Sequence, residues 1–539
     1  MDIEGREKMR RYFNTEGRCK PDIHYMVRLD DRLDKIKRLY IDQGKYFIIN
    51  RGRQYGKTTT LMALAEYLKD DYTVLPMDFQ LMSSANFSDE SAFVISFIEY
   101  LEDLVSERKE LTENIDLAVF ENLAALKDSQ RIHMDRLFRG LSRLCKTAKK
   151  PVVLMIDEVD SASNHQVFLD FLAMLRGYYL NQDYSSTFRS VILAGVYDIK
   201  NLKLKLRPEE KHQYNSPWNI AADFDINMSL SASKIAAMLD EYETDLGTGM
   251  DTETVAEEIY QYTSGYPYLV SAICKILDEK LPESERFLDN SPWTREGIGE
   301  AVKIILRSRL PLFDSMVKQL DIFVDLRGMI QSILYQGEKI VFNPDRKSIS
   351  IGIMFGFLRE KNGQIEIANR IFEMRLLNML LSDESVKSEM FFYGQNNMNQ
   401  FITGGKLNMD LVLEKFVTYF TDIYGHNDER FVEAHGRKFF LLYLKPIING
   451  AENYYIEAQT RDSKRTDVII DYLGQQFIVE LKIWHGNEYH ERGEEQLREY
   501  LDYYHLEKGY LLSFNFNKKK KPGMKEVRID GKTIVEAVV

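Results

Sequence analysis

Cysteine is scarce in this sequence. The 539 residues include three cysteines, Cys19, Cys145 and Cys274, which lie far apart and form no C-x-x-C or histidine-paired pattern. This scarcity excludes a disulfide-stapled fold and cysteine-based zinc or thiol chemistry. It predicts a protein that works in a reducing compartment.

Long apolar runs and an excess of basic residues are missing as well. No segment approaches the roughly 20 apolar residues that a membrane-spanning helix needs, and the charged start MDIEGREKMRR lacks the apolar core of a signal peptide. We therefore expect no membrane partner and a cytoplasmic location. The net charge of −12 argues against a surface coated for tight non-specific binding of nucleic acid, although it leaves room for a local basic cleft.

The composition provides enough material for several folded domains. Hydrophobic residues make up 44% of the chain and aromatic residues 12%. A chain of this length corresponds to about three or four domains. We therefore expect a folded multidomain protein.

The last quarter of the chain contains the most informative pattern, RTDVIIDYLGQQFIVELKIWHGNEYHERGEEQLREY. In the strand predicted over Phe477–Ile483, Glu480 and Lys482 lie on one face because strand side chains alternate. A hairpin that turns through residues 473–475 would bring Asp467 beside Glu480. Two such carboxylates suit a hard cation, Mg²⁺ or Mn²⁺, which neutralises charge on a phosphodiester and generates hydroxide.

Further residues of this region have predicted roles in the same reaction. Lys482 would orient the attacking water or help to deprotonate it. Gln496 and Tyr500 stand four residues apart in the helix-like stretch EEQLREYLDYY, so they share a face that would approach a nucleic-acid backbone. The alternative interpretation is a hairpin with solvated charges, followed by an ordinary amphipathic helix.

The pattern resembles the PD-(D/E)XK nuclease superfamily. Its D…ExK signature and the QxxxY element of its RecB-like members are matched, in order, by Asp467, Glu480, Lys482, Gln496 and Tyr500. Thr466 stands where the family usually has proline, and Glu433 is a candidate for a further acid or a surface glutamate. The resemblance implies a restriction-endonuclease-like α/β/α domain that cleaves nucleic acid, with DNA as the expected substrate. It leaves open DNA against RNA and endonuclease against exonuclease.

A second pattern lies near the other end of the chain, where residues 45–61 read KYFIINRGRQYGKTTTL. An apolar strand, a glycine turn and GKT form the order of a phosphate-binding loop, in which backbone N–H groups hold the β-phosphate. Lys57 would reach the β- and γ-phosphate oxygens, and Thr58 would hold Mg²⁺. The predicted nucleotide-binding residues here are Gly52, Gly56, Lys57, Thr58 and Thr59.

The first position of this loop departs from G-x-x-x-x-G-K-[ST]. Arg51 occupies the place of the first glycine, and Gly52 follows one place later. The loop is therefore expected to approach the γ-phosphate differently. Arg51 and Arg53 are candidates for a direct phosphate contact.

Residues 151–160, PVVLMIDEVD, are typical of a buried parallel strand that ends in acids, and they resemble a Walker B strand. In that interpretation Asp157 holds Mg²⁺ through water, and Glu158 polarises the attacking water as general base. Together the two motifs predict ATP binding. Hydrolysis also requires Glu158 and a charge-stabilising group.

Later segments are similar to other parts of AAA-type ATPases. Residues 190–196, SVILAGV, correspond to the sensor-1 strand, after which Tyr197 or Asp198 would replace the missing polar sensor. Arg207 is a candidate arginine finger, and the Gly-x-Pro turn ending in Pro267 would line the nucleotide base. The alternatives are an ordinary polar loop, a surface arginine and a simple helix start.

Taken jointly, these motifs resemble the prokaryotic AAA-ATPase-like proteins that carry a C-terminal PD-(D/E)XK domain. The resemblance implies an α/β fold with a P-loop NTPase core of the AAA/STAND-like type. A polar stretch at residues 394–405 is predicted as a hinge. The expected domains are an N-terminal arm (1–30), a P-loop AAA-like ATPase core (31–235), a helical lid (236–310), a winged-helix-like module (311–390) and a nuclease-like domain (405–539).

The predicted function follows from these two centres. The chain would bind and hydrolyse ATP and thereby control a Mg²⁺-dependent nuclease that acts on nucleic acid, in a prokaryotic defence role that this domain pairing implies. The alternative is an NTP-dependent regulatory switch or scaffold whose nuclease fold binds nucleic acid or a partner without cutting. Assembly into a homo-oligomer is left open between monomer and ring.

Overall fold

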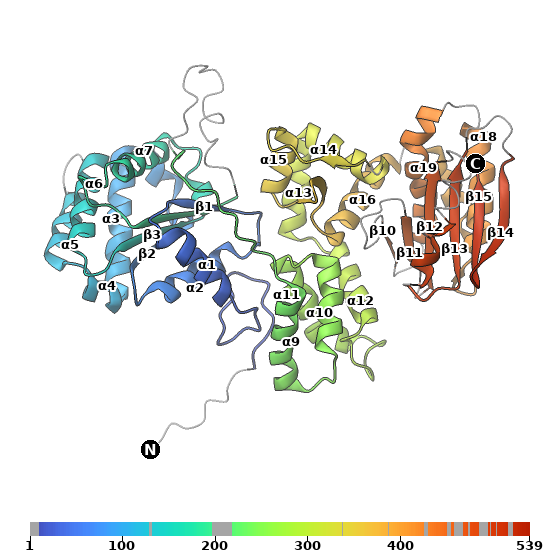
Figure 1. Cartoon of the computed structure of the whole chain (residues 1–539), viewed down its shortest axis with the longest axis horizontal. Helices are drawn as coiled ribbons and strands as arrows, with labels where there is room; N and C mark the ends of the chain where they lie inside the picture. Colours follow the sequence, from blue (N-terminus) through green and yellow to red (C-terminus); the bar gives the residue numbers. More distant parts are fainter. Residues whose placement is uncertain are drawn as a thin grey trace. The chain divides into compact units, whose positions relative to one another are not determined.

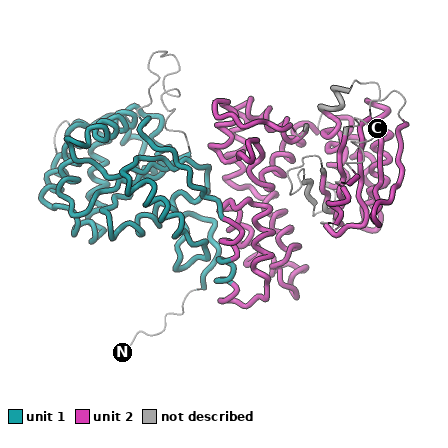
Figure 2. Tube along the Cα trace, in the orientation of Figure 1, with its two compact units in different colours: residues 1–230, 237–242 teal, residues 231–236, 243–539 magenta. Residues whose placement is uncertain are grey.

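A computed structural model describes most of the chain, and it divides the chain into two compact units (Figures 1 and 2). The first unit comprises residues 1–230 and 237–242, and the second comprises residues 231–236 and 243–539. The described residues are 10–128, 132–196, 218–336, 338–385, 388–424, 429–449, 454–457, 467–472, 475–483, 494–495, 497–502, 504–515 and 521–539.

The first unit is built on a parallel sheet with the strand order β1-β4-β3-β2. An isolated parallel bridge between Phe47 and Ala222 extends it beyond β1. The strands are β1 (Phe47–Asn50), β2 (Thr73–Asp78), β3 (Val152–Asp157) and β4 (Ser190–Gly195). The helices are α1 (Asp30–Ile36), α2 (Lys57–Leu68), α3 (Glu90–Glu107), α4 (Lys109–Asn114), α5 (Leu117–Ala124), α6 (Met134–Thr147) and α7 (Gln166–Leu180).

Helices cover both faces of this sheet (Figure 1). On one face Leu154 packs in a cluster with apolar side chains of α3, α6 and α7. On the other face its neighbour Val153 packs in a cluster with α1 and α2. Because successive strand side chains point to opposite faces, burial on both sides explains why β3 is apolar throughout before its terminal acid. The predicted P-loop NTPase fold is confirmed at this level.

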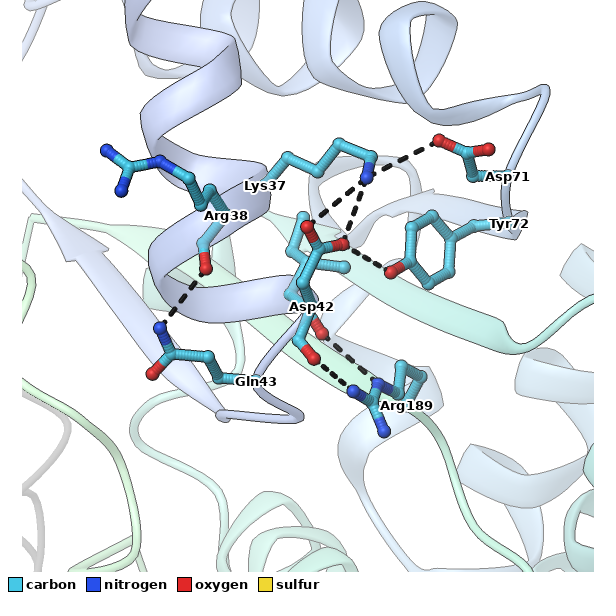
Figure 3. Close-up of polar contacts among 8 residues, drawn as sticks. Lys37, Arg38, Asp42, Gln43, Asp71, Tyr72 and Arg189 are labelled. Carbon is cyan, nitrogen blue, oxygen red and sulfur yellow. Dashed lines mark hydrogen bonds and ion pairs between the residues drawn. The ribbon is translucent and has the colours of Figure 1, made fainter.

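A polar network braces the edge of the sheet where its strands begin (Figure 3). The Asp42 carboxylate, which follows a π-helical turn at Lys37–Ile41, accepts hydrogen bonds from Lys37 Nζ at 3.0 Å and Tyr72 Oη at 2.6 Å. Burial alone would raise the pKa of Asp42, but these two bonds outweigh it and hold the pKa below its usual value. Arg189 donates to the backbone carbonyls of Ile41 and Asp42. Tyr72 and Arg189 directly precede β2 and β4, so the network fixes the ends of the sheet opposite to the phosphate loop.

The second unit begins with helices and a small antiparallel sheet. The expected lid contains α9 (Ala232–Leu246), whose residues 237–242 belong to the first unit, and α10 (Thr252–Thr263), α11 (Pro267–Lys275) and α12 (Arg295–Arg307). The next segment contains α13 (Pro311–Ile322), α14 (Val324–Gln331), β5 (Ile340–Val341), α15 (Lys347–Met354), β6 (Leu358–Lys361), β7 (Gln364–Ile367) and α16 (Arg370–Ser385). Its three-stranded sheet has the order β5-β7-β6, and the winged-helix-like module expected here stays a prediction.

The C-terminal part of the second unit is a mixed six-stranded sheet with the order β10-β11-β12-β13-β15-β14. Its strands are β10 (Tyr454–Glu457), β11 (Asp467–Tyr472), β12 (Gln475–Ile483), β13 (Lys508–Phe514), β14 (Gly523–Ile529) and β15 (Lys532–Val538). One face packs against Leu497 and Leu501. The other face contacts α18 (Met409–Tyr424) and α19 (Glu429–Asn449), where the rings of Phe420 and Phe514 lie 5.5 Å apart. The arrangement is a layered α/β/α fold.

The hinge predicted over residues 394–405 is wrong. This segment forms the end of α17 (Glu389–Asn397), a 3₁₀ turn and the β8–β9 hairpin (Ile402–Thr403 and Lys406–Leu407). Phe401 is fully buried, and its ring packs edge-on against Tyr443 of α19. The asparagine and glutamine residues suggested a linker, but α17 is docked on α19 by its apolar side. The expected boundaries at residues 235 and 390 likewise fall inside α9 and α17.

None of the helices that the structure describes is long and apolar enough to cross a membrane.

A substitution at Gly394 tests the docking of α17. A Cβ at this position would lie 2.1 Å from the Tyr443 carbonyl oxygen, so the two helices must separate. We expect Gly394→Ala to destabilise the second unit by about 1–3 kcal/mol. The control is Gly328→Ala in α14, where a Cβ meets nothing within 4 Å, so that variant should be as stable as the wild type or up to about 1 kcal/mol more stable. The free energies of unfolding of both variants would be measured by thermal and denaturant unfolding. Equal values for the two variants would contradict this packing.

Candidate functional site

The phosphate loop connects β1 to α2 with a backbone suited to anion binding. Gly56 takes a left-handed conformation, φ +79°, immediately before Lys57 starts the helix. Glycine adopts this conformation without strain. The free N–H groups of the first turn of α2 are therefore oriented toward the loop, as phosphate binding at a helix N-terminus requires.

Lys57 is buried against the loop, with 6% of its surface exposed. Its ammonium donates to the carbonyl oxygens of Arg51 at 3.0 Å and Gly52 at 3.1 Å. Burial lowers the pKa of Lys57, while the nearby carboxylates of Glu158, Asp160 and Asp157 oppose the fall. The lysine is thus held beneath the loop and close to the predicted acids.

Arg51 does not face the phosphate-binding side of the loop. Its guanidinium donates to the carbonyl oxygens of Asn50 at 3.0 Å and Phe224 at 3.1 Å, and it lies over the Phe224 ring. The suggestion that Arg51 contacts phosphate is therefore wrong. The side chain instead anchors the loop to the segment that contains Phe224, and a phosphate contact of the exposed Arg53 stays a prediction.

Asp157 ends β3 with 2% of its surface exposed. Its Oδ1 accepts the N–H of Glu158 at 2.9 Å, whereas the buried Oδ2 has no hydrogen bond of normal geometry within the described residues. Burial raises the pKa of Asp157, and the Thr58 hydroxyl and the Glu158 N–H oppose the rise. An oriented carboxylate oxygen beside a threonine hydroxyl is a donor set that fits Mg²⁺.

Glu158 follows in a left-handed conformation with φ +50°. Burial raises the pKa of its carboxyl group, and the neighbouring carboxylates of Asp157 and Asp160 add to the rise. The Lys57 ammonium acts in the opposite direction and lowers this pKa. A glutamate with a raised pKa is suited to accept a proton near neutral pH. Lys57, Asp157 and Glu158, three of the predicted nucleotide-site residues, are therefore together at the end of the sheet where its strands finish.

The N-terminal arm reaches the same helix. The backbone N–H of Cys19 donates to Thr59 Oγ1 at 3.1 Å. The arm is held in place by the packed rings of Phe13, Tyr25 and Tyr242 and by the ion pair between Arg11 and Glu241 at 2.7 Å. This bond gives the N-terminal arm a direct contact with the first turn of α2.

The remaining predicted residues of the ATPase lie in the second unit or outside the described residues. Pro267 opens α11 in the second unit, and its contact with a nucleotide base stays a prediction. Tyr197, Asp198 and Arg207 lie outside the described residues.

The nuclease-like pattern forms the predicted hairpin in the second unit. Asp467 of β11 is directly opposite Glu480 of β12. Glu480 is fully buried, and its Oε1 lies 2.6 Å from Lys482 Nζ. The Asp467 side chain lies outside the described part of the chain. Among the residues that are described, no group of three or more histidine, cysteine, aspartate or glutamate side chains is placed to hold a metal.

The helical residues after this hairpin pack on the same face. Tyr500 is 7% exposed and belongs to a cluster with Ile469, Ile478 and Leu511, so much of its ring serves packing. Its contact with nucleic acid remains a prediction. Gln496 and the side chain of Glu433 lie outside the described residues.

Sequence reasoning assigned no role to two acids near the ATPase site. Asp78 ends β2 in register with Asp157, and the only signal was that an acid closes the apolar run TVLPMD. Asp160 was visible as a third acid after the Walker B strand. Its partner, the N–H of Val196 at 2.6 Å, lies 36 residues away and could not be found from local spacing.

A protein-family model described as an AAA-like domain matches residues 20–305, which is more than half of the chain. No curated protein matches the sequence. Several solved structures are similar in fold. The Walker-type ATPase PABY2304 of Pyrococcus abyssi is 12% identical with a TM-score of 0.43, and the match covers 68% of this chain and 99% of that one.

Two further structures have lower TM-scores. The ORC1 protein of Aeropyrum pernix, solved in complex with DNA, is 13% identical with a TM-score of 0.29, over 66% of this chain and 93% of its own. A variant of RuvB from Thermotoga maritima is 12% identical with a TM-score of 0.31, over 63% of this chain and 92% of its own. At these identities and TM-scores the likenesses carry no information on function.

Replacing Arg51 tests its anchoring role. Arg51→Gly restores the usual first glycine of the loop but removes the bonds to Asn50 and Phe224. Because a hydrogen bond from a charged group contributes about 1.5–3 kcal/mol, we expect this variant to unfold at a lower temperature and to bind ATP more weakly than the wild type. The control is Arg139→Ala, since that side chain is 70% exposed and forms an ion pair with Asp135 of its own helix.

The measurements are thermal unfolding and equilibrium titration with a non-hydrolysable ATP analogue. An Arg51→Gly protein of unchanged stability and higher nucleotide affinity would show that the arginine obstructs the loop and does not anchor it.

Proposed function

The chain belongs to the AAA-like domain family, and from this premise we propose that it hydrolyses ATP with Mg²⁺ and thereby controls a Mg²⁺-dependent nuclease domain in its C-terminal part. The substrate of that domain would be nucleic acid, with DNA as the expected class. Defence against foreign DNA and assembly into a homo-oligomer belong to the same proposal.

The main support for the ATPase proposal is that Lys57, Asp157 and Glu158 lie close together at the carboxyl ends of β1 and β3. Lys57 is placed to exchange its two loop carbonyls for phosphate oxygens. Thr58 and Asp157 would hold Mg²⁺, which when bound neutralises phosphate charge. Glu158 would orient a water molecule and take its proton.

The hairpin register supports the nuclease proposal. Asp467 and Glu480 come from neighbouring strands at directly opposite positions, where Cβ atoms lie about 4.5–5.5 Å apart. That spacing allows both carboxylates to hold one divalent cation. Lys482, which already contacts Glu480, would orient the attacking water.

One observation favours the alternative of a regulatory switch that binds without cutting. Glu480 is fully buried, and Ile478 on the same face of β12 packs in an apolar cluster with Tyr500, so a substrate would have little access to the Glu480 carboxylate. In this second candidate function ATP would change the conformation of the chain, and the nuclease fold would bind nucleic acid or a partner.

The raised pKa of Glu158 predicts the pH dependence of ATP hydrolysis. Glu158 accepts a proton only when it is ionised, and burial favours its neutral form. Turnover should therefore fall as the pH falls through this raised pKa, at a higher pH than an exposed glutamate would give. Glu158→Gln should remove the acid limb together with most of the turnover. A kcat profile in which the acid limb persists in Glu158→Gln would assign it to another group.

Cleavage assays on the full chain test the nuclease and its control. Linear, circular and single-stranded DNA and RNA would be incubated with Mg²⁺ or Mn²⁺, with and without ATP. We expect Lys482→Ala to reduce cutting by roughly a hundredfold or more, and Lys57→Ala to abolish the effect of ATP on cutting.

Lys525→Ala is the matched control for Lys482→Ala. Lys525 also lies 2.6 Å from a buried glutamate, Glu536, but it belongs to β14, which is the edge strand at the opposite end of the sheet from β10 and β11. Loss of cutting in both variants would indicate a general loss of structure. No cutting of any substrate by a wild-type protein that binds ATP would favour the regulatory switch.

A further inference from the structure

One peptide group at the end of β4 joins the two loops of the ATPase site. The carbonyl oxygen of Gly195 accepts the N–H of Arg51, the first residue of the phosphate loop, at 3.3 Å. On the other side of the same peptide plane, the N–H of Val196 donates to Asp160 Oδ2 at 2.6 Å. Since β4 lies between β1 and β3, this peptide bridges the loops that follow its two neighbours.

The absence of a side chain at Gly195 makes room for the bridge. A Cβ there would lie 2.8 Å from Asp160 Oδ1 and 3.0 Å from Val159 Cγ2. The space that a polar side chain at the end of β4 would occupy is thus taken by the Asp160 carboxylate. The glycine is needed for this close approach and not for an unusual backbone angle.

Asp160 belongs to the turn that carries Glu158. The backbone of Glu158 is left-handed, which is unfavourable for a residue with a side chain, so the turn must be held by other contacts. Ser161 Oγ donates to the carbonyl oxygen of Phe79 at 3.2 Å, and Ser163 Oγ donates to that of Asp160 at 2.7 Å. The bond from Val196 to the Asp160 carboxylate is charge-assisted, and it is the contact that ties this turn to β4.

We propose that Asp160 is a positioning residue for ATP hydrolysis. Through the Gly195–Val196 peptide it fixes the Glu158 turn relative to the phosphate loop, and it takes the place of a polar side chain at the end of β4. Asp160 touches neither nucleotide nor water in this role and acts through Glu158. The inference rests on the proposed ATP hydrolysis and adds a residue to it.

Steady-state ATP turnover and direct binding of a non-hydrolysable ATP analogue, both on the full chain, test the role. We expect Asp160→Ala to lower kcat by about tenfold to a hundredfold, with KM and the analogue Kd changed less than about threefold, because a small misplacement of a catalytic group costs this much. Asp160→Asn should recover part of the loss, since its amide oxygen still accepts the Val196 N–H. In a Glu158→Gln background, Asp160→Ala should cause no further loss.

Matched substitutions separate the bridge from general damage. In Gly195→Ala the new Cβ would displace the Asp160 carboxylate, so this variant should show the same loss of kcat as Asp160→Ala. Gly177→Ala in α7, where a Cβ meets nothing within 4 Å, should resemble the wild type. Asp170→Ala removes an exposed acid of the same helix that accepts a hydrogen bond from Gln166, and this variant should turn over ATP like the wild type.

The proposal is overturned if Asp160→Ala turns over ATP like the wild type, if its defect lies in nucleotide binding, or if its effect adds fully to that of Glu158→Gln. An active wild type that Glu158→Gln disables shows the proposed hydrolysis independently of Asp160. If the wild type does not hydrolyse ATP, the proposed function fails and the positioning role fails with it. Amide hydrogen exchange at Val196 then tests the bridge alone, and unchanged protection in Asp160→Ala would refute it.

Discussion

Charged side chains that are buried at the end of a parallel sheet need hydrogen-bond partners. In this protein most of those partners are backbone N–H and carbonyl groups. A buried charge without partners is strongly unfavourable. Arg51 and Lys57 donate to carbonyl groups, while the carboxylates of Asp157 and Asp160 accept backbone N–H groups. Because each of these peptide groups belongs to a strand end or a loop, satisfying the charge also fixes the loop. The geometry of the ATPase site follows from this constraint.

The two lysines of the candidate centres illustrate different solutions to the same problem. Lys57 is held by neutral carbonyl dipoles, so its positive charge is left uncompensated at the contact and available to an anion. Lys482 is held by the carboxylate of Glu480, so the pair is close to neutral by itself. The proposed phosphate contact therefore begins with an exchange of carbonyl groups at Lys57, whereas at Lys482 the proposed chemistry begins from an ion pair that is already formed.

Much of the fold was predictable because its signals are local. The apolar runs of β3 and β4 are buried on both faces, and the register of Asp467 with Glu480 follows from strand alternation and turn length. The hinge prediction for residues 394–405 failed because composition does not reveal that α17 approaches α19 closely at Gly394. The anchor from Arg51 to Phe224 spans 173 residues, so only the folded chain could reveal it. The same holds for Asp160, whose acidic character was visible but whose partner was not.

The contact between Cys19 and Thr59 indicates that the folded ATPase core includes part of the N-terminal arm. The family match starts at residue 20, one position after the N–H that reaches α2. Arg11 and Phe13, which hold the arm against Glu241 and Tyr242, lie still earlier. A fragment cut at the family boundary would retain every nucleotide-binding motif and yet lose the brace on the first turn of the phosphate-binding helix. The segment that packs together as the ATPase core therefore begins earlier in the chain than the segment that matches the family model.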